Sequence, residues 1–113
     1  MTTWIAEEPV VFVHPDGTRS PGRIALGAPV RHELDCACQA ALDGLERSVA
    51  IYGSTTLQAL LLASRFLGMR LHDFLSRGGR VLYPPGVDDV ADDGEDTDVP
   101  LSALFSSFLR EPD

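Results

Sequence analysis

Apolar side chains recur at every third or fourth position between residues 53 and 79, in the longest mainly apolar stretch of the chain. This spacing predicts one long amphipathic helix. Thr55 is a natural N-cap, and Gln58 would complete a capping box by accepting a hydrogen bond from the backbone N–H of Thr55. Gly78 and Gly79 end the helical pattern. We expect one helix face to cover a sheet, and that face comprises Leu57, Leu60, Ala63, Ser64, Leu67, Leu71, Phe74 and Leu75.

Alternating patterns ahead of this helix predict four strands, each bounded by turn residues. A hairpin should join the first two strands, because Pro15, Asp16 and Gly17 stand between them as a strong turn signal. Residues 30–34 fit an edge strand and a loop equally well. The predicted strands are residues 4–13, 22–26, 35–42 and 47–52. One face of the third strand carries Cys36, Cys38, Ala40 and Leu42.

After the helix, residues 80–83 predict a short strand that Pro84 and Pro85 terminate. The order of elements predicts an α+β fold, in which one long helix covers one face of an antiparallel sheet of about four to five strands. We expect one α+β domain at residues 1–86, an acidic solvated loop at 87–98 and a short amphipathic helix at 99–113. The apolar stripe of this C-terminal helix is Leu101, Leu104, Phe105, Phe108 and Leu109.

The net charge of −8 narrows the choice of partners. Nucleic acid and anionic lipid both bind proteins through clusters of Lys and Arg, so we expect neither to bind this chain. A basic protein is a better match for its negative charge. The first residues show no basic region followed by an apolar stretch, and the long apolar segment is interrupted by Arg65 and Arg70. We therefore expect neither a signal peptide nor a membrane span.

Three segments between Trp4 and Pro85 resemble a widespread family of small, uncharacterised bacterial proteins that carry a domain of unknown function. Its helix-start signature looks like Gly, apolar, Asp, small, Leu, Gln, Ala, Leu, and here Thr55 stands at the acidic position. Cys36 stands where an aromatic residue is usual. The resemblance covers roughly three quarters of the chain and implies this fold and a bacterial, cytoplasmic setting, without a catalytic residue. The segments are Cys38 with Leu42, Gly44 and Leu45, then residues 53–60 (GSTTLQAL), then residues 78–83 (GGRVLY).

Candidate chemistry is sparse, and we expect no cofactor and no metal. Cys36 and Cys38 form a Cys-x-Cys pair, but two ligands are too few for structural zinc, so we expect two small core side chains. The acidic stretch does not match the ligand positions of an EF-hand loop. No serine stands in a nucleophile elbow beside a histidine. We expect the histidines to be scattered over the surface, and they are His14, His32 and His72.

The long helix carries a second apolar stripe, turned about 100° or more from its core face. This stripe consists of Leu62, Phe66 and Met69, with Ala59. Something must cover it. Either the C-terminal helix folds back there, or the stripe is a subunit or partner interface, for which Phe and Met are favoured residues. The candidate partner-binding residues are Leu62, Phe66, Met69, Asp88, Asp89, Asp92, Asp93, Glu95 and Asp96.

These features predict a non-enzymatic protein-binding module, and a toxin-neutralising immunity protein is its most concrete form. Such proteins are small and acidic and lack catalytic machinery, as this chain does in sequence. A homodimer through the helices is a further option. The alternative is a small-molecule binder or enzyme with a site between sheet and helix, for which the candidate residues are Arg65, Arg70 or His72 with Tyr83.

Overall fold

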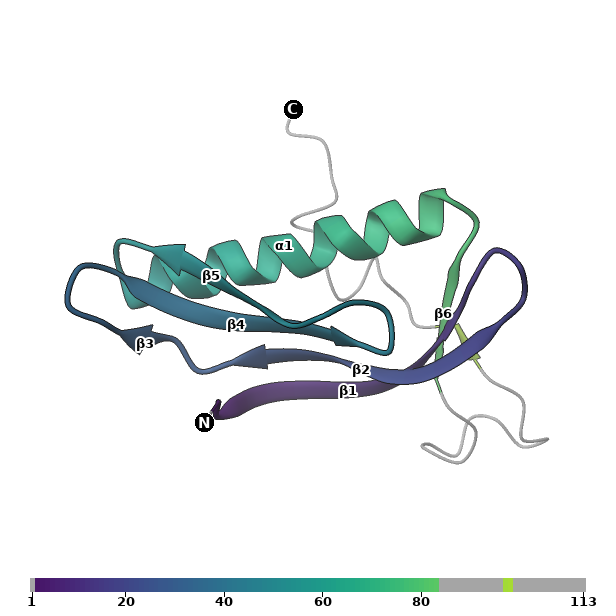
Figure 1. Cartoon of the computed structure of the whole chain (residues 1–113), viewed down its shortest axis with the longest axis horizontal. Helices are drawn as coiled ribbons and strands as arrows, with labels where there is room; N and C mark the ends of the chain where they lie inside the picture. The colour runs from purple at the N-terminus through teal and green to yellow at the C-terminus, as the bar shows by residue number, and fades with distance from the viewer. Residues whose placement is uncertain (1, 84–96, 99–113) are drawn as a thin grey trace.

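The computed structural model describes residues 2–83 and the backbone of residues 97–98. In this part of the chain, one long helix packs on one face of an antiparallel sheet, which confirms the predicted α+β class (Figure 1). The elements are β1 (Trp4–Val13), β2 (Arg19–Gly27), β3 (Val30–Arg31), β4 (Cys36–Asp43), β5 (Val49–Gly53), α1 (Thr56–Ser76), β6 (Arg80–Tyr83) and β7 (Thr97–Asp98).

Across the described strands, the sheet order runs β5, β4, β2, β1, β6, β7, and every pairing is antiparallel. The short β3 lies on the β2 side of β4, because Cys36 and Ala37 pair with β3 on one side and with β5 on the other. β2 begins earlier than predicted, since its ladder with β1 continues up to the pair formed by Val13 and Arg19. Of the residues of β1, only the last three pair with β6.

The predicted hairpin between β1 and β2 is confirmed. Gly17 has a φ of +92°, a conformation that glycine adopts without strain. The backbone N–H of Gly17 donates to the carbonyl oxygen of His14 at 2.8 Å, and the N–H of Thr18 donates to the carboxylate of Asp16 at 2.9 Å. The Asp side chain thus caps the turn, as its position in the sequence predicts.

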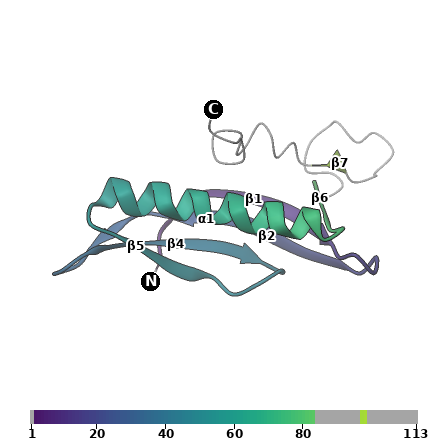
Figure 2. The same ribbon diagram turned by 90° about the horizontal axis from the view of Figure 1, so that it is seen from above.

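α1 lies over β4 and β5 rather than over the middle of the sheet (Figures 1 and 2). The side chains at this contact are small. Cys36 and Cys38 of β4 are buried there, which confirms the predicted inward face of that strand, and α1 contributes Ala59 and Ala63. The first helical turn also approaches Gly53 closely, because a Cβ atom on that residue would lie 2.7 Å from the backbone nitrogen of Ala59. Small residues therefore hold α1 near one edge of the sheet.

Most of the predicted core face of α1 is confirmed, with Ala63, Leu67 and Leu71 almost fully buried. The prediction for Leu57 is wrong, since 63% of its surface is exposed. Ala59, expected on the second stripe, is instead fully buried. At 100° per residue, Ala59 lies only about 40° around the helix from buried Ala63 and packs beside Gly53, whereas Leu57 lies about 120° from Ala63.

The capping box at the start of α1 is confirmed with one change of partner. The hydroxyl of Thr55 accepts from the N–H of Gln58 at 3.0 Å. The side chain of Gln58 reaches back to the N–H of Ser54 rather than to that of Thr55, because the chain enters the helix with Thr55 extended. At the other end, Gly78 has a φ of +98° and terminates the helix as predicted.

The predicted C-terminal helix at residues 99–113 and the acidic residues 88–96 lie outside the described residues. The end of the predicted acidic loop is described in part. Thr97–Asp98 form β7, whose two residues pair with Tyr83 and Leu82 of β6. This pairing fixes the point from which the last residues of the chain start.

Candidate functional site

The first candidate surface is the side of α1 that carries Leu62, Phe66 and Met69, here called the β5 flank. Leu62 is 39% exposed and Met69 is 54% exposed. Phe66 is partly buried and packs against the core, so it contributes less free surface than its position in the sequence predicts. Two apolar side chains of the predicted stripe are thus accessible in the described part of the chain.

The β5 flank lies on the side of α1 that is nearest to the β5 edge of the sheet. With about 100° of rotation per residue, its three side chains lie on the same side of α1 as Arg70. The guanidinium of Arg70 donates two hydrogen bonds, of 3.0 and 2.7 Å, to the carboxylate of Glu46 in the turn between β4 and β5. Ser64 and Leu67 lie toward the opposite side of α1, over β1 and β2. The ion pair therefore lies at the border of the β5 flank, where α1 meets the turn between β4 and β5.

β5 forms one edge of the sheet within the described residues, because β4 is its sole ladder partner there. The alternate N–H and C=O groups of an edge strand point outward and can pair with another strand. Ile51 packs against the core from this strand, whereas Tyr52 is exposed. Figure 1 shows β5 running beside α1, so we expect a partner on the edge of β5 to reach this side of the helix as well.

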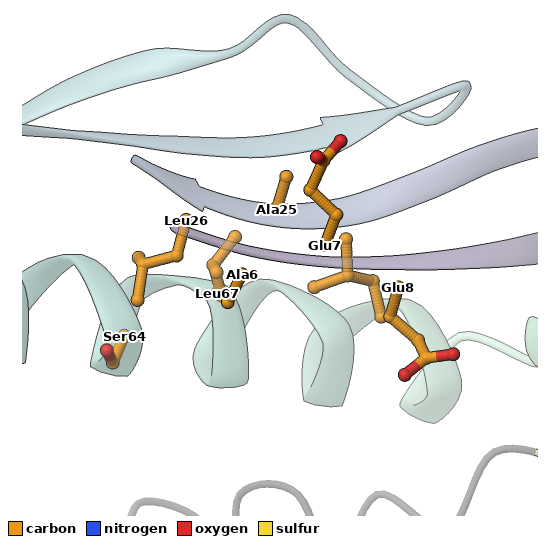
Figure 3. A pocket seen from close by; sticks show the side chains of 8 residues that line it. Ala6, Glu7, Glu8, Ala25, Leu26, Ser64 and Leu67 are labelled. Carbon is orange, nitrogen blue, oxygen red and sulfur yellow. The ribbon is translucent and has the colours of Figure 1, made fainter. Parts of the chain in front are cut away.

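The second candidate surface is a groove between α1 and the strands β1 and β2, with a volume of about 230 Å³ (Figure 3). It exists because α1 sits over β4 and β5 and leaves this half of the sheet uncovered by the helix. The register places Ala6 opposite Leu26 and Glu8 opposite Ile24, so these four side chains share one face of the sheet. The lining residues are Ala6, Glu7, Glu8, Ile24, Ala25, Leu26, Ser64 and Leu67.

The residues suggested for a small-molecule site are not gathered in this groove. Arg65 and His72 are exposed on α1, and neither lines the groove. Arg70 is engaged by Glu46 on the other side of the helix, and this carboxylate raises the pKa of Arg70. Tyr83 belongs to β6 and does not line the groove either. The groove instead has apolar walls, with the carboxylate of Glu8 at its rim.

Cys36 and Cys38 are both free and buried, as predicted for small core side chains. The thiol of Cys38 donates to the carbonyl oxygen of Gly27 at 3.2 Å, and burial raises the pKa of this thiol above its ordinary value. It is therefore held as the neutral thiol. Among the described residues, no group of three or more His, Cys, Asp or Glu side chains is arranged to hold a metal ion.

One pair of polar residues escaped the sequence analysis. A ring nitrogen of His14 lies 3.0 Å from the hydroxyl of Ser20, and the His14 ring stands edge-on to Phe74. A nucleophile beside a base is the start of a catalytic arrangement, but neither residue lines the groove. The pair spans the β1–β2 hairpin, near the cross-strand pair Phe12 and Ser20, so it closes the end of the core. This pair could have been found only from the register in which β1 and β2 pair, and the sequence does not give that register.

The opposite face of the sheet holds a fixed cluster of charges around Arg23. Its guanidinium lies 4.4 Å from the centre of the Trp4 ring and pairs with Glu7 and Asp43. The two carboxylates raise the pKa of Arg23. Because one guanidinium from β2 holds a carboxylate of β1 and a carboxylate of β4, we assign this cluster a structural role in holding the three strands together.

The remaining predicted partner-binding residues, the acidic ones, lie outside the described residues. They are Asp88, Asp89, Asp92, Asp93, Glu95 and Asp96. For the residues that the structure describes, no helix combines the length and the apolar character needed to cross a membrane. Comparisons of the chain with protein-family models, curated proteins and solved structures found no match. The family resemblance stays a prediction from the sequence.

Proposed function

We propose that the chain is a non-enzymatic, bacterial protein-binding module that contacts its partner through the β5 flank and the open edge of β5. The observation that carries this proposal is the exposure of Leu62 and Met69 beside a strand edge. Scattered apolar residues on a surface need no explanation. Two of them next to a strand edge that has no ladder partner among the described residues offer both of the contacts that strand addition uses, namely main-chain hydrogen bonds and apolar side-chain contacts.

The local charge also suits a protein partner. Arg70 and Glu46 neutralise each other at the boundary of the surface, and Arg77 pairs with Asp73 one turn further along α1. The net charge of −8 is therefore not concentrated here. A partner that docks beside these two ion pairs meets charges that are already paired, which lowers the cost of burying them.

A toxin-neutralising immunity protein is the concrete form of this proposal. A basic toxin would meet the acidic residues 88–96 over a long range, and such charges speed encounter more than they add affinity. The apolar contact at the β5 flank would then provide most of the stability of the complex. We propose a cytoplasmic location for this activity, in line with the sequence.

Affinity capture from the native host tests the proposal when two matched variants accompany the wild type. Met69→Glu places a charge on the β5 flank, and Leu57→Glu places the same charge at an exposed position outside it. We expect wild type and Leu57→Glu to retain one stoichiometric partner and Met69→Glu to lose it. Retention of the partner by Met69→Glu, or capture of none by the wild type, would refute the proposal.

A second copy of the chain is the alternative partner for the same surface. Sedimentation of the purified protein separates the two cases, because a dimer through the β5 flank would dissociate in Met69→Glu and not in Leu57→Glu. A wild type that stays monomeric over a wide concentration range leaves a different protein as the partner.

The groove between α1 and the β1–β2 strands supports a second candidate, a small-molecule binder. Its apolar lining with polar groups at the rim is typical of ligand sites. A thermal-shift screen of metabolites, nucleotides and metals tests it, because a ligand at a hundred times its dissociation constant adds roughly 2.7 kcal/mol of stability. We expect hits from apolar compounds if this candidate is right, and their absence would exclude it.

A further inference from the structure

The groove between α1 and the strands β1 and β2 has a carboxylate at its rim, and this charge narrows the class of ligand that fits. We propose that the groove binds a small primary amine with an apolar body, with the ammonium group at Glu8 and the body between Leu26 and Leu67. This inference rests on the second candidate function, a small-molecule binder, and names the chemistry of its ligand. It does not depend on the partner surface at the β5 flank.

The charges of the groove favour a cation over an anion. None of the side chains that line it belongs to an Arg, a Lys or a His. Two glutamates are among the lining residues, but Glu7 points to the other side of β1 and pairs with Arg23 (Figure 3). Glu8 points to the groove side, and within residues 2–83 no side chain forms an ion pair with it. A cationic ligand would supply the missing charge, whereas an anionic one would be repelled.

The hydrogen-bonding side chains of the groove favour a ligand that donates. The carboxylate of Glu8 only accepts hydrogen bonds. The hydroxyl of Ser64 already donates to the carbonyl oxygen of Leu60 at 2.9 Å, so its oxygen is left with lone pairs that accept. A primary ammonium group has three donors and no acceptor, so it is complementary to such side chains. A ligand whose polar group only accepts finds no side-chain donor here.

The apolar lining fits a body about the size of an aromatic ring. Leu67 is 3% exposed and Ile24 is 7% exposed, and Leu26 packs against the same core. A cavity of about 150 Å³ is large enough to hold benzene. The groove has a volume of about 230 Å³, so a ring leaves room for a short chain that carries the amine.

The strand register gives the spacing between the two ends of the ligand. Ala6 lies opposite Leu26, and Glu8 lies opposite Ile24. Two residues along a strand span about 7 Å, at roughly 3.3 Å per residue. A ring over Ala6 and Leu26 therefore needs only a short arm to bring its ammonium group to Glu8, whose own side chain covers part of the distance. The simplest molecule of this kind is 2-phenylethylamine.

Calorimetric titration of the full-length protein with three probes of similar shape tests the ligand class. The probes are 2-phenylethylamine, which is a cation at neutral pH, the neutral 2-phenylethanol and the anion 3-phenylpropanoate. We expect the amine to bind at least fivefold more tightly than the alcohol and at least tenfold more tightly than the acid. Glu8→Gln should remove the advantage of the amine over the alcohol. Glu33→Gln, which removes an exposed carboxylate outside the groove, should keep it.

Methyl NMR of the full-length protein tests the location. Adding 2-phenylethylamine should shift the methyl signals of Leu26 and Leu67 and leave those of Leu57, outside the groove, in place. Ala6→Leu fills the groove from an exposed position, so it should abolish these shifts.

The possible failures are distinguishable. Equal affinity for the three probes, tightest binding of the acid, or methyl shifts away from Leu26 and Leu67 would overturn the proposal. If the thermal-shift screen finds other ligands of the groove and none of these probes binds at millimolar concentration, the ligand class is wrong and the small-molecule function stands. If the screen finds no ligand either, that function fails with it.

Discussion

The two halves of the sheet surface beneath α1 are built differently. The β4–β5 half carries small side chains, such as Cys36 and Cys38, and α1 lies close to it. The β1–β2 half carries larger ones, such as Ile24 and Leu26, and faces a groove. Small residues on both partners allow a helix to approach a sheet closely, so the helix settles where they are rather than over the centre. As a result, α1 leaves an apolar surface uncovered on the β1–β2 half of the sheet.

This difference explains why one helix gives rise to two candidate surfaces. A helix centred on the sheet would bury both of its sides against neighbouring strands. Here α1 lies over β4 and β5, where Leu62 and Met69 stay exposed, and falls short of β1, where Ala6 is exposed. The β5 flank faces outward and suits another protein, while the groove is concave and has a mainly apolar lining. The predictions below test this division.

The largest expected effect comes from Leu42, which is 1% exposed beneath α1. Leu42→Ala should lower the free energy of unfolding by about 2–5 kcal/mol, the usual cost of a cavity of this kind. Urea unfolding measures it. Leu26→Ala, at a partly exposed position in the groove, should lower this free energy by less. Equal losses at the two sites would mean that the two halves are covered alike.

The close approach at Gly53 predicts the next effect. A Cβ atom there would stand 2.7 Å from the backbone nitrogen of Ala59, which has little room to move. Gly53→Ala should therefore lower the free energy of unfolding by about 1–3 kcal/mol, as expected for overpacking. Ser54→Ala, one residue away and exposed, should change it by less than about 0.5 kcal/mol. A neutral Gly53→Ala would show that α1 is not held by this contact.

The sequence predicts the elements better than it predicts their arrangement. The period-two pattern that includes Cys36 and Cys38 identified the inward face of β4, and the Thr55 and Gln58 pair located the start of α1. Both are local signals, because a strand face and a helix cap each depend on residues within a few positions. The same local reasoning located the turn at Gly17.

The error at Leu57 and the unforeseen groove have a common cause. Apolar periodicity gives the angles between helix positions but not where the sheet lies, so it does not show that Ala59 packs at Gly53 while Leu57 stays exposed. The groove combines residues of β1, β2 and α1 that are far apart in the chain. The β5 flank was found from sequence because all three of its residues belong to one helix, although periodicity did not show that Phe66 is partly buried.

A smaller effect concerns the pH dependence contributed by Cys38 on the covered half. Burial raises the pKa of this thiol, and a thiolate could not donate to the carbonyl oxygen of Gly27. The neutral Cys38 thiol therefore contributes fully to the free energy of unfolding at pH values below the thiol pKa of the unfolded chain, about 8.5. This contribution is lost as the pH rises above that value. Relative to Cys38→Ala, the wild type should lose stability at no more than about 1.4 kcal/mol per pH unit, the limit for one proton. Urea unfolding between pH 7 and 10 measures the difference, and parallel curves would contradict it.

The smallest effect is expected on the β5 flank. Met69 is more than half exposed, so Met69→Gln should change the free energy of unfolding by less than about 0.5 kcal/mol. The matched change Leu67→Gln puts an amide at a position that is 3% exposed and should cost several times as much. Both are measured by urea unfolding of the purified protein at low concentration. If Met69→Gln destabilises the monomer as much as Leu67→Gln does, then part of the chain already covers the flank, and this surface is not available to a partner.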